Sequence, residues 1–173
     1  MARYRDFDLV VLPTDSEHRG YYEAAGVGRL AVQRCVPNGH LRGVIGSACP
    51  FCMSGDWVWQ DVSGKGAIYS YEIVTQAIQP AFRDWVPYPV VLVELDEQRN
   101  VPWRWGLEGE AVSVRLITNL VRRDDATLPE DEAEVAIGRR VEVCFVDLGA
   151  GLALPQFRLS DEPPEHEPWR APL

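Results

Sequence analysis

The feature that most constrains this chain is a series of five strand-like runs in its second two-thirds. Each run is rich in β-branched and aromatic residues or alternates apolar with polar positions, and both patterns are typical of strands. The second run contains an unbroken apolar stretch, which predicts burial on both faces over part of its length. The runs cover residues 66–77, 88–97, 111–121, 139–148 and 152–159. The chain is therefore expected to be mainly β.

The segment between the third and fourth runs, residues 126–138, predicts one or two helical turns. Pro129 suits a helix start and Gly138 suits a helix end. Five strands with a helix between the third and the fourth follow the order of an OB-fold, a partly open five-stranded Greek-key barrel. We therefore expect an OB-fold barrel over residues 63–160.

A further helix is predicted near the N-terminus, over residues 14–26. Thr14 or Asp15 can cap its start, and a glycine can end it. Tyr21 and Tyr22, near the end of this helix, are expected to pack against the segment that follows or against a partner.

The last thirteen residues contain four prolines and four acidic residues. Such a segment buries too little apolar surface to offset the entropy of ordering, so it is expected to be disordered or extended on a neighbour. The expected organisation is an N-terminal arm and helix (1–27), a zinc-ribbon-like segment (28–62), the OB-fold (63–160) and the tail (161–173).

The ribbon-like segment holds three of the four cysteines. Cys49 and Cys52 form a CxxC knuckle, the tight turn that places two thiolates on one tetrahedral metal. Cys35 begins a second knuckle, but Asn38 stands where its partner is expected, and His40, two residues further on, is the candidate fourth ligand. Two hypotheses stay open: these residues bind a structural zinc, or the knuckle has lost its metal and remains as a packed hairpin.

Composition bears on partners and location. The net charge is −9, from 17 basic and 26 acidic side chains, which argues against non-specific binding to nucleic acid or to an anionic membrane. Because no apolar run approaches the roughly 18 residues of a membrane span, we expect a cytoplasmic protein with reduced thiols.

Recognisable catalytic motifs are missing from the sequence. There is no GxSxG elbow, no glycine-rich phosphate loop and no HExxH. Cys144 lies in an apolar strand run, where a thiol acts as a small hydrophobe, so it is expected in the core and not as a nucleophile. The sequence therefore favours a protein that is not catalytic alone.

Seven short motifs, in order, resemble the zinc-ribbon and OB-fold proteins catalogued as domain of unknown function 35. The resemblance covers about residues 15–160. The motifs are GRLAVQRC (28–35), NGHLRG (38–43), CPFC (49–52), DWVWQDVSGKGAIYSY (56–71), VPYPVVLVELDE (86–97), IGRRVEVCF (137–145) and LPQFR (154–158). Proteins of this kind associate with thiolase-fold enzymes, including steroid side-chain aldolases. The resemblance thus implies an accessory subunit that supports assembly and acyl-CoA binding without supplying the catalytic cysteine.

The chain departs from this family pattern between the second and third strand runs, where it carries an insertion over residues 98–110. Trp103 and Trp105 in the insertion, and Trp169 in the tail, either anchor a partner or pack on the chain's own barrel.

Two other functions are weighed beside the accessory role. An autonomous acyl-CoA-binding protein needs a site for the CoA phosphates, and the clustered candidates are Arg122, Arg123, Arg139 and Arg140. Surface solvation explains these arginines equally well. A single-stranded nucleic-acid-binding OB module would use aromatic residues such as Tyr69 and Tyr71 to stack bases, but the acidic charge disfavours it.

Overall fold

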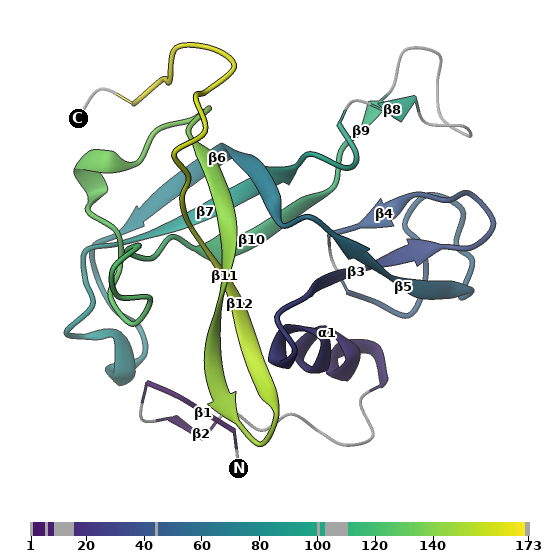
Figure 1. Cartoon of the computed structure of the whole chain (residues 1–173), viewed down its shortest axis with the longest axis horizontal. Helices are drawn as coiled ribbons and strands as arrows, with labels where there is room; N and C mark the ends of the chain where they lie inside the picture. Colours follow the sequence, from purple (N-terminus) through teal and green to yellow (C-terminus); the bar gives the residue numbers. More distant parts are fainter. Residues whose placement is uncertain are drawn as a thin grey trace.

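The computed structural model describes residues 2–5, 7–8, 16–43, 45–99, 101–102 and 111–171. It is a mainly β structure with one α-helix, and it confirms the predicted OB-fold (Figure 1). The barrel consists of β6 (Lys65–Val74), β7 (Tyr88–Leu95), β10 (Arg115–Asn119), β11 (Arg140–Gly149) and β12 (Leu152–Leu159).

The barrel strands pair in the order β10–β7–β6–β11–β12, and all neighbours are antiparallel. A parallel bridge between Leu120 and Phe157 joins the two edges, which closes the sheet on itself. The predicted helical segment between the third and fourth strands contains a single 3-10 turn, η2 (Glu132–Glu134), capped by the Asp131 side chain.

The entry to the barrel requires glycine. Gly64 has φ +74°, in the left-handed region that favours glycine. At Gly66 a Cβ atom would lie 2.4 Å from the carbonyl oxygen of Glu94 on β7. The missing side chain of Gly66 therefore lets β6 approach β7 closely.

Two predicted strand features differ in the structure. The third run forms β9 (Ala111–Val112) and β10, because β9 pairs with β8 (Val101–Pro102) instead of continuing along β7. The second run, β7, is not buried on both faces: buried and half-buried residues alternate along it, and Val90 and Leu92 line a surface cavity. This outer face of the barrel is therefore only partly covered.

The ribbon-like segment is a second sheet, made of β3 (Leu30–Cys35), β4 (Leu41–Arg42) and β5 (Trp57–Val62) in the order β4–β3–β5. The single helix, α1 (Ser16–Gly26), contacts both β3 and β12 and lies between this sheet and the β11–β12 hairpin (Figure 1). Thr14 and Asp15, the predicted caps, lie outside the described residues.

The ribbon and the barrel share one hydrophobic core. The ribbon contributes Leu30, Val32 and Leu41, which cluster with the buried residues of the barrel strands. Gln98, which is buried, adds a polar link: it accepts a hydrogen bond from the backbone N–H of Leu41 (2.8 Å) and donates one to its carbonyl (3.2 Å). The cysteine-bearing sheet is therefore fixed to the barrel.

The short N-terminal hairpin, β1 (Arg3–Tyr4) and β2 (Phe7–Asp8), lies near the β11–β12 turn, and η1 (Pro80–Phe82) follows β6. The tail beyond β12 is extended on the chain's own barrel: Trp169 and Ile137 exchange two backbone hydrogen bonds. Among the described residues, no helix is long and apolar enough to cross a membrane.

Candidate functional site

The three cysteines of the ribbon converge. Cys35 ends β3, and Cys49 and Cys52 lie in the loop between β4 and β5. Their three sulfur atoms lie within 4.8 Å of one another, and the Sγ atoms of Cys35 and Cys52 are 3.5 Å apart. Thiolates that share one tetrahedral zinc at about 2.3 Å lie about 3.8 Å from one another, so this spacing fits a metal site.

Asn38, not His40, lies beside the sulfur cluster. The Asn38 side-chain amide donates to Cys49 Sγ at 3.4 Å, while its oxygen accepts from the backbone N–H of His40. His40 is not part of the group. Its ring is buried and packs on Phe51 of the knuckle, with centroids 5.3 Å apart, so it contacts the knuckle without joining the group of sulfur atoms. The structure therefore brings together three of the four predicted ligands.

The surroundings of the thiols favour ionisation of one of them. Burial opposes ionisation of Cys49, but hydrogen bonds from the Phe51 backbone and the Asn38 amide outweigh it and lower the pKa of this thiol to about 7. Burial raises the pKa of Cys35 to about 11. Cys35, Cys49 and Cys52 would hold the metal, and a soft thiolate set of this kind suits zinc. Such a metal would cross-link the ribbon.

Cys144 is half-buried on β11, and burial raises the pKa of its thiol to about 11. A thiol with a raised pKa remains protonated and is a poor nucleophile at neutral pH. Cys144 is not among the buried residues of the hydrophobic core, so the expectation that it lies in the core is wrong, because its position on β11 is only partly covered.

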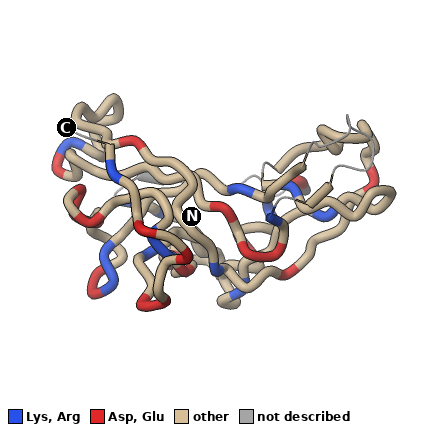
Figure 2. Tube along the Cα trace, turned by 90° about the horizontal axis from the view of Figure 1, so that it is seen from above, with Lys and Arg blue, Asp and Glu red and all other residues tan. Residues whose placement is uncertain are grey.

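The four arginines predicted as CoA contacts are each paired with a carboxylate of this chain. Arg122 pairs with Asp124, Arg123 with Asp161, Arg139 with Glu134, and Arg140 with both Asp96 and Glu162. Figure 2 shows basic positions interspersed with acidic ones along the trace. The predicted cluster is thus divided among separate ion pairs.

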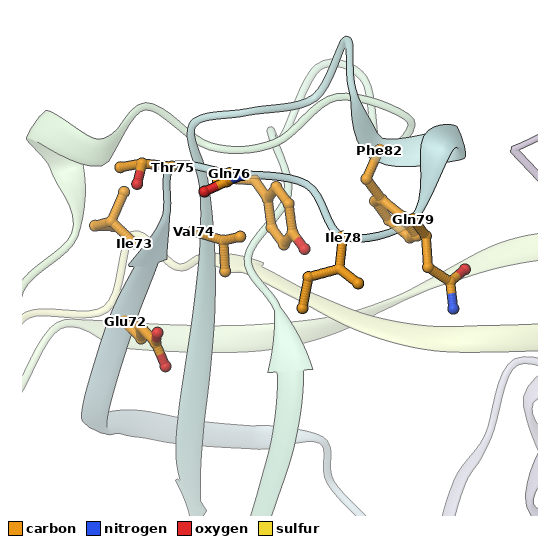
Figure 3. A pocket seen from close by; sticks show the side chains of 9 residues that line it. Glu72, Ile73, Val74, Thr75, Gln76, Ile78, Gln79 and Phe82 are labelled. Atoms are coloured by element: carbon orange, nitrogen blue, oxygen red, sulfur yellow. The ribbon is translucent and has the colours of Figure 1, made fainter.

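An open cavity of about 580 Å³ lies where β6 ends and η1 begins (Figure 3). Apolar side chains of Val74, Ile78 and Phe82 gather around it, and Ile78 is 98% exposed. A second cavity of about 260 Å³ shares Glu72 with the first and is lined by Ile117, which is 76% exposed. The surface around these two cavities, on β6, β7 and β10 and the loop that bears Ile78, therefore combines exposed apolar side chains with polar ones, and we call it the barrel face.

The aromatic residues predicted to bind a partner have different positions. Tyr21 packs against the chain's own core, and its ring stands edge-on to Tyr22 at 5.5 Å. Trp169 is 56% exposed. Trp103 and Trp105 lie outside the described residues. Sequence reasoning missed Ile78 and Ile117, since isolated apolar residues carry no signal of exposure.

The chain is similar in sequence and in fold to known proteins. The family described as ChsH2, C-terminal OB-fold domain, matches residues 59–146. The chain belongs to this family. It is 32% identical to a chain of a solved structure titled "Ltp2-ChsH2(DUF35) aldolase", with a TM-score of 0.61, and the match covers 86% of this chain and 98% of that chain. The family assignment agrees with the resemblance to domain of unknown function 35.

One relative of similar sequence is a longer protein. A "Probable enoyl-CoA hydratase alpha subunit" of Thermomonospora curvata is 35% identical over 138 residues, which are 80% of this chain. The chain spans only 36% of the length of that relative. In that protein, therefore, a ChsH2-like region is one part of a larger polypeptide.

Proposed function

We propose that the chain is a non-catalytic accessory subunit of a thiolase or thiolase-like aldolase complex. It would support assembly of the complex and binding of its acyl-CoA substrate during carbon–carbon bond cleavage or formation. One observation carries the proposal: the match over 98% of a chain in the Ltp2-ChsH2(DUF35) aldolase. A relative named as an enoyl-CoA hydratase subunit supports the wider setting of acyl-CoA chemistry.

The barrel face supports the proposal that the chain binds a partner. Ile78 and Ile117 expose apolar surface beside two neighbouring surface cavities, and such surface offers a place for a partner to bind. Together with Trp169 and the insertion that bears Trp103 and Trp105, this face is the proposed contact with the thiolase-fold subunit.

The ribbon has a structural role in this proposal. Zinc held by Cys35, Cys49 and Cys52 would fix the loop between β4 and β5. The barrel would then border the partner's active site, and the partner would supply the reactive cysteine. Substituting Cys49 or Cys52 should therefore weaken the ribbon and the complex while leaving the chemistry on the partner.

The nucleic-acid alternative has less support. The guanidinium of Arg115 lies over the ring of Tyr69 at 3.5 Å, and the Tyr71 hydroxyl accepts a hydrogen bond from Ala171. Both aromatic residues that could stack bases are thus engaged within the chain. Autonomous acyl-CoA binding is the second candidate, because Arg122 and Arg123 keep substantial exposure beside their carboxylate partners.

The experiment is native purification of the protein, with identification by mass of what comes with it and measurement of zinc per chain. Co-purification with a thiolase-fold subunit supports the proposal. The exposed-surface argument is tested by Ile117→Glu, which should release the partner while the circular dichroism stays unchanged. Val27→Glu is the matched control, since Val27 is 68% exposed but lies at the end of α1. A chain that purifies without a partner and binds a CoA ester would favour autonomous acyl-CoA binding. A chain that purifies without a partner and does not bind a CoA ester would refute both candidates.

A further inference from the structure

Three basic side chains from distant parts of the sequence meet at one end of the barrel. Lys65 begins β6, Arg99 follows β7 and Arg140 begins β11. One carboxylate of the barrel, Asp96, pairs with both arginines: its Oδ1 lies 2.9 Å from Arg99 Nη2 and 2.8 Å from Arg140 Nη1. The nearby barrel carboxylates Glu142 and Glu94 are paired with Arg158 and Arg115, so the barrel offers three positive charges against the single remaining negative charge of Asp96.

The acidic tail supplies the missing negative charges. Glu162 pairs with Lys65, and its Oε2 lies 3.0 Å from Arg140 Nη2. Glu165 Oε1 lies 2.5 Å from Arg99 Nη1. Two carboxylates three residues apart thus contact all three cations, as the two ends of a diphosphate could. Without the tail, the group formed by Lys65, Arg99, Arg140 and Asp96 would carry a net charge of +2.

The tail leaves this group incompletely satisfied. Arg99 Nε is buried and has no hydrogen-bond partner in the part of the chain that the structure describes. Arg99 also lines a cavity of about 170 Å³ together with Ile68 and Gly138 on the barrel, and the tail residues Glu165 and His166 close one side. A phosphate bears more oxygen acceptors than a carboxylate, and arginine binds phosphate through the same bidentate, charge-assisted hydrogen bonds.

The tail is held to the barrel by contacts that a competing ligand can replace. Its backbone exchanges two hydrogen bonds with Ile137 through Trp169, and Ala171 donates to the Tyr71 hydroxyl at 3.1 Å. The side chain of Glu165 is 63% exposed and Trp169 is 56% exposed. Because the tail carboxylates of these ion pairs, Glu162 and Glu165, remain accessible to solvent and no described tail residue belongs to the hydrophobic core, a competing anion can displace the tail.

We propose that Lys65, Arg99 and Arg140 form a binding site for phosphate groups, which the chain's own acidic tail, residues 161–171, covers and competes for. The tail is a built-in substitute ligand: its carboxylates occupy the positions of phosphate oxygens until a polyanion of higher charge replaces them. The site does not depend on the proposed accessory role.

Isothermal titration of the full-length chain with inorganic pyrophosphate at low ionic strength tests the proposal. Removing the two competing charges in the double variant Glu162→Gln, Glu165→Gln should tighten binding by at least about tenfold, and added salt should weaken it. Adding Lys65→Ala to the double variant should abolish the gain. Glu167→Gln is the matched control, because it removes a tail charge outside these ion pairs and should bind as the wild type does.

Two results would overturn the inference. One is a double variant that keeps its circular dichroism and melting temperature but binds pyrophosphate no more tightly than Glu167→Gln. The other is a gain that survives Lys65→Ala, which would place the bound anion elsewhere. A parallel titration with ADP separates the sources of the phosphate: equal affinity supports a site for the anion itself, and higher affinity supports a site for a phosphorylated nucleotide.

Discussion

Gln98 provides the sharpest test of how the ribbon is attached to the barrel. Replacing it by leucine keeps the volume of the side chain but removes both hydrogen bonds to the Leu41 backbone. Each buried backbone group left without a partner costs about 1–3 kcal/mol, and burial of the leucine side chain returns about 1–2 kcal/mol. We therefore expect Gln98→Leu to lower the free energy of unfolding by about 2–3 kcal/mol.

Urea denaturation followed by circular dichroism measures this loss. With a slope of about 2 kcal/mol per molar urea, the midpoint should fall by about 1 M. Gln76→Leu is the matched control: Gln76 is exposed, so its replacement should change the free energy of unfolding by less than about 0.5 kcal/mol. If the two variants unfold at the same midpoint, the polar link does not hold the ribbon to the barrel and the reasoning is refuted.

Three further predictions concern the barrel entry, the thiols and the buried arginine. Gly66→Ala should destabilise by at least about 2 kcal/mol because its methyl group meets backbone, whereas Gly46→Ala, with open space, should be near neutral in the same urea assay. Zinc affinity should fall at least about tenfold per pH unit below pH 7, as Cys49 regains its proton, and Cys49→Ser should reduce bound zinc measured by metal analysis. Hydrogen bonds from Arg140 lower the pKa of Asp96, so their stabilising effect is present above about pH 4 and is lost as the pH falls below it. Asp96→Asn should therefore melt at a lower temperature than the wild type at pH 7, and the two melting temperatures should converge in acid.

The positions of the barrel strands along the chain could be predicted because each strand has a local sequence pattern. The alternation in residues 152–159 and the apolar run of 88–97 each identify a strand without knowledge of its neighbours. The division of residues 111–121 could not be predicted, because the break at Val114 arises from pairing with β8, a segment of the insertion. Tertiary pairing overrides local propensity at such points.

The candidate sites were predictable to different degrees. The CxxC spacing indicated Cys49 and Cys52, since two ligands close in sequence are necessarily close in space. The place of Asn38 beside Cys49 depends on how the β3–β4 turn directs each side chain, which residue spacing alone does not specify. The group of Lys65 and Arg99 was missed for a related reason: its members lie far apart in sequence, and only the pairing of β6 with β7 brings them together.

The ribbon's attachment explains how it can exist with an asparagine at the fourth ligand position. An isolated zinc ribbon draws its stability from the metal, so the loss of one ligand would be expected to unfold it. Here Leu30, Val32 and Leu41 are buried in the barrel's core, and Gln98 satisfies the backbone where the two sheets meet. The ribbon therefore has a second source of stability. Metal removal should accordingly loosen the loop between β4 and β5 while leaving β3 protected from hydrogen exchange.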